Sequence, residues 1–423
     1  MTTSTIQRTI DAIWRIESAK LIAALAKLVN DVGLAEDLAQ DALVAALEQW
    51  PTEGIPAKPG AWLMTVAKRR AIDRIRRDKL SERKYAELSR QLEAEGEQGV
   101  SAVERVVSDE VEDDLLRLIF IACHPVLSTE ARVTLTLRLL GGLTTEEIAR
   151  AFLVPTPTIA QRITRAKRTL SAAQIPFEAP PASQRLARLA SVLEVIYLIF
   201  NEGYAATAGD SWIRPTLCEE ALRLGRILAE LTPQEAEVHG LVALMEIQAS
   251  RLRARVGPRG EPILLLDQSR AQWDQLLIRR GLAALARAQK LGGALGPYTL
   301  QAAIAACHAR ARTAEETDWE RIAALYDALA QLTPSPIIEL NRAVALGMAY
   351  GPAVGLELAD LLNAEPSLAN YHLLPSVRGD LLAKLGRSAE AAAEFERAAA
   401  LTQNERERAL LIERARAVTN PMP

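Results

Sequence analysis

Cysteine and histidine are both scarce in this chain of 423 residues. The three cysteines, Cys123, Cys218 and Cys307, lie far apart. An odd number of distant cysteines forms neither a disulfide framework nor a zinc quartet, so we expect reduced, buried thiols. His124 and His308 each follow a cysteine directly, but neither pair has a second ligand pair at metal spacing. We therefore predict no metal site and no cofactor.

Long apolar runs and an excess of charge are absent as well. The run "VIYLIF" at 195–200 is far shorter than the roughly 20 residues of a membrane span, and the polar start does not resemble a signal peptide. A formal net charge of −3 excludes a globally basic nucleic-acid coat, so any DNA contact must come from local patches. Aromatics make up only 4%, and alanine, leucine, glutamate and arginine dominate. We expect a cytoplasmic, all-α protein without membrane contact.

The segment 143–170, "LTTEEIARAFLVPTPTIAQRITRAKRTL", predicts two helices around a tight turn. Thr144 and Glu147 have the capping-box spacing that starts a helix. In the turn, Thr156 is placed as N-cap of the second helix, with Pro157 at its first helical position. An apolar stripe on the first helix is expected at Ile148, Ala151 and Phe152.

The second of these helices divides into an apolar and a polar face. The apolar face consists of Ile159, Ile163, Ala166 and Leu170. The opposite face consists of Thr158, Gln161, Arg162 and Arg165. A recognition helix in a DNA major groove needs this division, with one side on the core and hydrogen-bonding groups toward base edges and phosphates. An ordinary surface helix pair with a basic face is the alternative reading.

An acidic helix is predicted nearer the N-terminus, at 34–50, "LAEDLAQDALVAALEQW". Leucine and alanine residues, Leu38 among them, form one helical face. Asp37, Gln40 and Asp41 share a second face at i, i+3, i+4 spacing.

A loop rich in proline and glycine, 51–60, separates this helix from a basic one at 61–79. Trp62 opens the basic helix. Its basic residues are Lys68, Arg69, Arg70, Arg74, Arg76, Arg77 and Lys79. A solvated basic face explains such a run, but a tryptophan beside cationic groups also suits unstacked single-stranded bases.

The order and spacing of these segments resemble the extracytoplasmic-function class of bacterial sigma factors, in the sigma-70 family and similar to sigma-24. The resemblance implies sigma region 2 over 6–80, an acidic linker over 81–108 and sigma region 4 over 109–173. It further implies RNA polymerase core, through its β′ clamp helices and β flap, and promoter DNA as partners.

Site residues carried by this resemblance fall into three sets. The set implied for docking on polymerase core is Asp37, Leu38, Gln40 and Asp41. The set implied for capture of the −10 element is Trp62, Lys68, Arg69, Arg70, Arg74, Arg76 and Arg77. The set implied for reading the −35 element is Thr156, Thr158, Gln161, Arg162 and Arg165.

The second half of the chain predicts helix pairs. In 373–402 two helices flank a turn at Gly386-Arg387, and Ala389, Ala392, Phe395 and Ala398 are expected at packing positions. A weaker copy, 340–362, lies about 36 residues earlier, close to the tetratricopeptide period. We predict a tetratricopeptide-like extension over 185–417, which resembles the tail of one group of these sigma factors. Such arrays present a concave surface to proteins or peptides, or serve a structural role alone.

No catalytic motif accompanies the extension. The sequence has no glycine-rich phosphate loop, nucleophile elbow or metal-ligand cluster, so we expect no enzyme activity. Glu202, Arg251, Arg270 and Trp273 are a candidate ligand or interdomain surface, with a protein or small-molecule partner.

Two functions therefore compete at this point. The first is a transcription initiation factor whose extension regulates its activity. The second is a helical-repeat interaction scaffold whose N-terminal basic helices bind DNA nonspecifically. The acidic face at 37–41 together with the aromatic and basic helix favours the first, because a scaffold needs neither.

Overall fold

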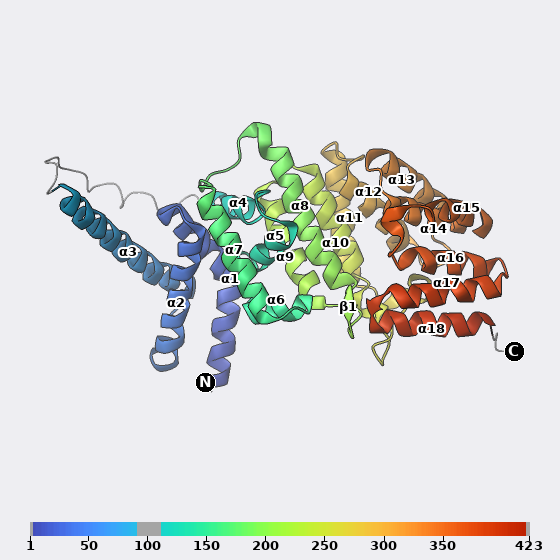
Figure 1. Cartoon of the computed structure of the whole chain (residues 1–423), viewed down its shortest axis with the longest axis horizontal. Coiled ribbons are helices and arrows are strands. Elements are labelled where there is room, and N and C mark those ends of the chain that lie inside the picture. The colour runs from blue at the N-terminus through green and yellow to red at the C-terminus, as the bar shows by residue number, and fades with distance from the viewer. Residues whose placement is uncertain (1–2, 91–110, 420–423) are drawn as a thin grey trace. The chain divides into compact units, whose positions relative to one another are not determined.

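The computed structural model describes residues 3–90 and 111–419, and its contacts divide the chain into two compact units (Figure 1). The N-terminal unit is Met1–Val195 and the C-terminal unit is Ile196–Pro423. Apart from two strands of two residues each and short 3-10 turns, the regular structure described is α-helical, which confirms the predicted all-α class.

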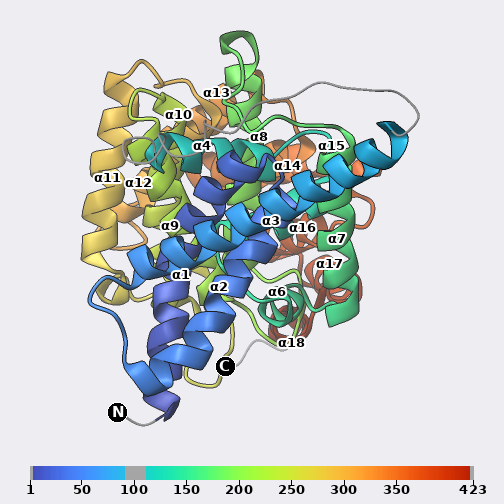
Figure 2. The ribbon, with the colours of Figure 1, turned by 90° about the vertical axis from the view of Figure 1, so that its left-hand side faces the viewer.

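The N-terminal unit contains two sets of helices, α1 to α3 and α4 to α7. Its elements are α1 (Thr3–Val29), α2 (Val32–Glu53), α3 (Pro59–Arg90), α4 (Val111–Ala122), α5 (Thr129–Leu139), α6 (Thr145–Phe152), α7 (Thr156–Ala172) and the first part of α8 (Ala182–Tyr204). Helices α1 and α2 pack on each other and on α3, which lies across them in Figure 2. Their core holds Leu21, Leu25, Trp50 and Leu63.

Helix α3 is longer than its apolar pattern predicts. It continues to Arg90 and so enters the segment 81–108 expected as a linker. The other residues of that linker, 91–108, lie outside the described part of the chain. Sequence periodicity ended the helix early because the residues beyond position 79 carry no core stripe.

The beginning of α8 belongs to the N-terminal unit and packs on α4 and α5. Arg188 donates to the backbone oxygen of Phe120 at 2.6 Å, and the Ser191 hydroxyl donates to that of Cys123 at 3.0 Å. Arg132 of α5 donates to Ser191 and forms an ion pair of 3.2 Å with Glu194. This compact unit therefore extends past residue 173, where region 4 was expected to end.

The C-terminal unit is a succession of helices. Its elements after α8 are β1 (Ala208–Gly209), α9 (Pro215–Leu231), α10 (Ala236–Ala249), η1 (Leu252–Arg255), η2 (Leu265–Asp267), η3 (Arg270–Gln272), α11 (Gln275–Lys290), α12 (Pro297–Arg310), α13 (Trp319–Leu332), α14 (Pro336–Tyr350), α15 (Pro352–Leu362), η4 (Pro366–Leu368), α16 (Leu373–Lys384), α17 (Ser388–Leu401), β2 (Gln403–Asn404) and α18 (Glu405–Thr419). Strands β1 and β2 pair in parallel. The buried Asn404 side chain donates to the backbone oxygens of Ala206 and Ser211, both at 2.9 Å, and so holds β2 beside the 206–211 segment.

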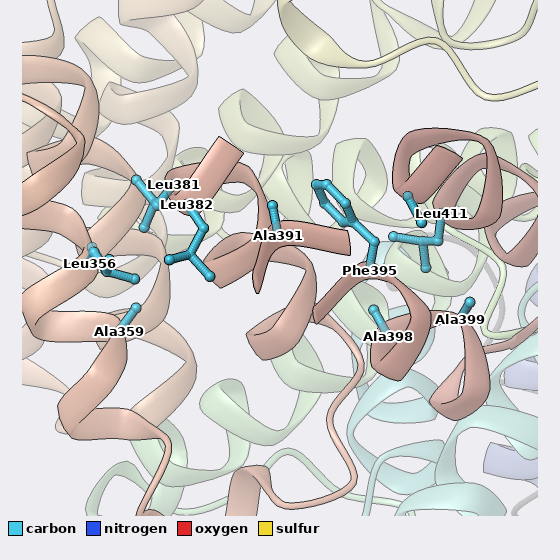
Figure 3. Packing of buried hydrophobic residues seen from close by; sticks show 11 residues of the cluster. Leu356, Ala359, Leu381, Leu382, Ala391, Phe395, Ala398, Ala399 and Leu411 are labelled. Carbon is cyan, nitrogen blue, oxygen red and sulfur yellow. The ribbon is translucent and has the colours of Figure 1, made fainter. Parts of the chain in front are cut away.

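The predicted helix pairs exist as α14–α15 and α16–α17. Figure 3 shows their shared core, a cluster in which leucines and alanines of α15 to α18 join Phe395 of α17. Ala392, Phe395 and Ala398 are buried as predicted, but Ala389 is exposed and Ala391 is buried. The prediction for Ala389 was wrong because this residue lies in the first turn of α17, beside the chain reversal at Gly386 rather than at the helix crossing.

Candidate functional site

Helices α6 and α7 form the predicted helix-turn-helix. The Thr144 hydroxyl accepts from the Glu147 backbone N–H at 3.1 Å, and the Glu147 carboxylate accepts from that of Thr144 at 2.9 Å, which confirms the capping box. Leu153 ends α6 in the left-handed region, with φ of 51°. The predicted N-cap at Thr156 is wrong, because α7 already begins there and Pro155 takes the cap position without a side-chain bond.

The two faces of α7 are as predicted. Its buried residues are Ile159, Ile163, Ala166 and Leu170. On the opposite side Thr158, Gln161 and Arg165 are exposed, while Thr156 and Arg162 are half-buried. Arg162 also reaches back to the Thr134 hydroxyl of α5, with a donor–acceptor distance of 3.5 Å. Of the apolar stripe expected on α6, Ile148 is buried, and Ala151 and Phe152 are half-buried.

The predicted docking residues on α2 differ in exposure. Asp37 and Asp41 are exposed, Gln40 is half-buried and Leu38 lies in the core at 5% exposure. Asp41 pairs with Arg70 of α3 at 3.8 Å, and the Gln40 amide donates to Glu36.

The basic helix carries an aromatic pair at its start. Trp62, half-buried, meets the buried Trp50 edge to face, with ring centroids 5.3 Å apart. The contact lies at the base of the loop, where Gly54 ends α2 with φ of 88°. Further along α3 the predicted basic residues divide into exposed and half-buried ones. Arg69, Arg74, Arg76 and Arg77 are exposed, and Lys68 and Arg70 are half-buried. Burial lowers the pKa of Lys68.

Sequence reasoning missed a buried glutamate between the two sets of helices. Glu36 of α2 has 2% exposure and contacts Arg138 of α5 at 2.6 Å and Lys167 of α7 at 2.7 Å. Lys167 also pairs with Asp37 at 3.2 Å. The pattern of α2 alone could not reveal this cluster, because both cations come from helices more than 100 residues away in the chain.

Three of the four candidate ligand residues in the C-terminal unit meet around one ring. The guanidinium carbons of Arg251 and Arg270 lie 5.6 and 4.8 Å from the Trp273 ring centroid. Arg270 donates to the backbone oxygen of His308 near the end of α12, and to Thr317 at 3.0 Å. Burial, with the charges of Arg251 and Arg270, lowers the pKa of His308 to about 3. Arg270 therefore supports the end of a helix, where carbonyl groups are otherwise unpaired.

Glu202, the fourth candidate, is separate from that group in its contacts. It pairs with Arg214 and accepts from the Thr207 hydroxyl at 2.9 Å.

The three cysteines are buried, and burial raises the pKa of Cys123 to about 11 and of Cys218 to about 12. Neither is activated as a nucleophile at neutral pH. Among the residues of 3–90 and 111–419, no three His, Cys, Asp or Glu side chains are grouped to hold a metal ion. None of the helices in that part of the chain is long and apolar enough to cross a membrane.

Comparison with known families assigns both sets of N-terminal helices. Residues 16–80 match the model of sigma-70 region 2, and residues 117–170 match that of sigma-70 region 4. Residues 188–289 match a family of unknown function, DUF6596. Protein R00370 of Rhizobium meliloti (strain 1021), itself uncharacterized, is 42% identical over 391 residues, 92% of this chain and 91% of that protein.

Named relatives resemble the N-terminal part. "Probable ECF RNA polymerase sigma factor SigI" of Mycobacterium tuberculosis is 28% identical over 178 residues, 42% of this chain and 59% of its own length. "ECF RNA polymerase sigma factor SigK" of Mycobacterium ulcerans is 27% identical over 155 residues, 36% of this chain and 78% of its own. The chain belongs to the extracytoplasmic-function sigma-70 factors that carry a C-terminal extension.

As a sigma factor, the protein is a transcription initiation factor, and the partners implied by this family are RNA polymerase core and promoter DNA. The family consists of non-enzymatic factors. A solved structure of yeast Tom70 is only slightly similar, with a TM-score of 0.31 at 13% identity over 99% of this chain and 84% of that one.

Proposed function

We propose that this sigma factor reads the −35 element with the exposed face of α7 while α2 and α3 bind polymerase core and the −10 element in the bacterial cytoplasm. The observation that carries the proposal is the position of Thr158, Gln161 and Arg165 opposite a fully buried apolar stripe. Amide and guanidinium groups on such a face can bond base edges and phosphates in a major groove.

Core docking is assigned to the acidic surface of α2, through Asp37 and Asp41 toward the β′ clamp helices. Region 4 is assigned to the β flap. The carboxylates are exposed, so a basic surface of the partner can reach them.

Promoter opening is assigned to the loop before α3 and to its first turns. Trp62 is held at its edge by Trp50, so its ring is positioned before DNA arrives. Unstacking a base costs a few kcal/mol, and stacking on an aromatic ring offsets about 1–3 kcal/mol of it. The arginines farther along α3 neutralise backbone phosphates.

Regulation is assigned to the C-terminal extension. Support comes from α8, whose first turns are bonded to α4 and α5 through Arg188, Ser191 and Arg132. The extension also offers a cavity of about 730 Å³ near η2, α16 and α18, where Leu265, Val377 and Lys384 could meet a protein segment or small molecule.

In vitro transcription with purified bacterial core polymerase tests this function. The full-length protein is expected to direct transcripts from its own upstream region. Arg165→Ala is expected to weaken promoter binding by about 1–3 kcal/mol, the usual cost of a lost base-edge contact, and to relax specificity at one position. Arg185→Ala, at an exposed arginine on α8, is the matched control.

Two results would contradict the proposal. If the full-length protein yields no transcript and also does not retain core polymerase, the alternative function, a helical-repeat interaction scaffold, would be favoured. A loss from Arg165→Ala that is equal on every DNA sequence would make this residue a phosphate contact instead of a reader.

A further inference from the structure

The cavity of about 730 Å³ in the C-terminal unit lies between the segment 262–267 and the helices α14, α16 and α18. Most of its lining residues are apolar, and the others are a serine and five charged side chains. Sites for small molecules typically enclose about 300–1,000 Å³ and combine a mainly apolar lining with a few polar groups. The size and the lining of this cavity are therefore those of a small-molecule site.

The wall formed by the segment 262–267 is held in place by the rest of the unit. The Ile263 backbone N–H donates to the backbone oxygen of Arg255 at 2.9 Å, and the amide of the buried Gln268 donates to the backbone oxygen of Ile263 at 3.0 Å. Leu265 packs against the cluster around the buried Trp273. Because these contacts exist without a ligand, binding would cost little entropy for ordering this wall.

The same wall leaves apolar surface uncovered. Leu264 is 38% exposed and Leu266 is 41% exposed, although both line the cavity. The helices across from them contribute Val377 and Leu410, which are half-buried. A single exposed leucine is ordinary in a folded protein, but here two of them share a cavity with other apolar residues. The apolar body of a ligand would remove this surface from water, which favours binding.

The charged residues of the lining are unevenly paired. Lys384 and Arg414 both form ion pairs with Asp380, and the ammonium-to-carboxylate distance of Lys384 is 2.8 Å. Asp267 and Glu413 are exposed and make no ion pair within the described part of the chain. The unpaired charges of the cavity are thus both negative, and its carboxylates outnumber its cations. A cationic ligand is attracted by this arrangement and an anionic ligand is disfavoured.

We propose that this cavity binds a small amphipathic cation, with an apolar body against Leu264 and Leu266 and a protonated amine toward Asp267 and Glu413. The inference deepens the regulatory role proposed for the extension, because it names the class of molecule to which the extension responds. All of the lining residues belong to the C-terminal unit, so ligand binding can be measured without polymerase or DNA.

Equilibrium dialysis of the full-length protein against three naphthalene probes tests the ligand class. The probes are 1-naphthylmethylammonium, the uncharged 1-naphthylmethanol and the anion 1-naphthoate. We expect the ammonium probe to bind at least about threefold more tightly than the alcohol, an effect within the range of partly exposed ion pairs, and the anion to bind most weakly. Equal affinity for the three probes, tighter binding of the anion, or no binding at all would overturn the proposal.

A residue that fills the cavity tests where the probes bind. Ala417 lines the cavity and is exposed, so Ala417→Trp places an indole there without displacing a core residue. It is expected to weaken the binding of the ammonium probe at least about tenfold, because the indole takes the space that would bury the ligand. Ala409→Trp, at an exposed residue of α18 outside the lining, is the matched control and should bind as wild type does. Unchanged binding by Ala417→Trp would place the probe elsewhere and overturn the proposal.

Removal of the two unpaired carboxylates tests the charge preference independently of the indole. Asp267→Asn combined with Glu413→Gln is expected to bind the ammonium probe and the alcohol about equally, since both ion pairs with the ligand are lost. Glu357→Gln combined with Glu396→Gln removes two exposed carboxylates outside the cavity and should keep the preference of wild type. A preference for the ammonium probe that survives in the first double variant would overturn the assignment of its amine.

The ligand site and the regulatory role can fail separately. If the full-length protein binds the ammonium probe but yields the same transcript as the fragment 1–195, the site is confirmed and the regulatory role of the extension is removed. If the extension changes the transcript but the protein binds none of the three probes, the regulatory role stands and the ligand site is overturned.

Discussion

At Gly355 the backbones of α14 and α15 lie so close together that a side chain has no room. A Cβ at this position would lie 2.5 Å from the Ala343 backbone oxygen and 2.8 Å from the Gly347 Cα. Both of these are backbone atoms, so no flexible side chain can move aside. The pairing of two small residues across the crossing therefore sets how near the two helices stand.

Gly355→Ala is expected to destabilise the protein even though alanine favours a helix by about 1 kcal/mol over glycine. Overpacking against backbone costs about 1–3 kcal/mol and should dominate. Urea unfolding of the full chain, followed by circular dichroism, should show a lower midpoint for the C-terminal unit. Val354→Ala, at the neighbouring exposed residue, should change it little, and a higher midpoint for Gly355→Ala would contradict the close crossing.

Single residues show where periodicity is informative. The stripe at Ile159, Ile163 and Leu170 was predictable because helical spacing alone decides which face is buried. The predicted cap at Thr156 was wrong by one residue, and Ala389 was wrongly predicted to be buried. Both residues lie at the start of a helix, and the ends of helices depend on local backbone geometry that residue spacing does not encode. Glu36 could not be found at all, because its partners are distant in the chain.

Among the elements, α8 is the one whose role the sequence least revealed. Its residues fall on both sides of the division between the two units at Val195 and Ile196. The family resemblance implied that region 4 ends at residue 173, before α8 begins. The bonds from Arg188 and Ser191 to α4 and its end place the first turns of α8 with region 4 instead. Local composition can predict where a helix starts, but it does not predict which neighbouring helix the new helix packs on.

The fragment 1–195 is expected to be more stable than 1–173 by roughly 2 kcal/mol or more. The shorter fragment loses the bonds of Arg188, Ser191 and Arg132, each of which contributes about 0.5–1.5 kcal/mol. Thermal unfolding of both fragments measures the difference. Within 1–195, Arg188→Ala should lose part of it and Arg185→Ala none, while equal midpoints for the two fragments would refute the role of α8.

At the scale of the whole molecule, the order of the parts was predictable and their association was not. Motif order along the chain indicated both sigma regions, and family matches at 16–80 and 117–170 agree with it. The small residues of 373–402 indicated the helix pair α16–α17. The packing of regions 2 and 4 into one unit was not predictable. The contacts that join them, the packing of α1 on α4 and the ion pairs of Glu36, link residues far apart in the chain and leave no local pattern.

The full-length protein is expected to direct transcription with core polymerase, whereas the fragment 1–195 is expected to bind core and a −35 duplex but to yield little transcript. The reason is α8, a single helix whose residues belong to both units and whose first turns are bonded to region 4 within the N-terminal unit. Run-off transcription with matched amounts of each protein, after core binding is verified for both, provides the measurement. Equal transcript from the two proteins would make the extension an accessory surface, and transcript from the fragment alone would make it an inhibitor.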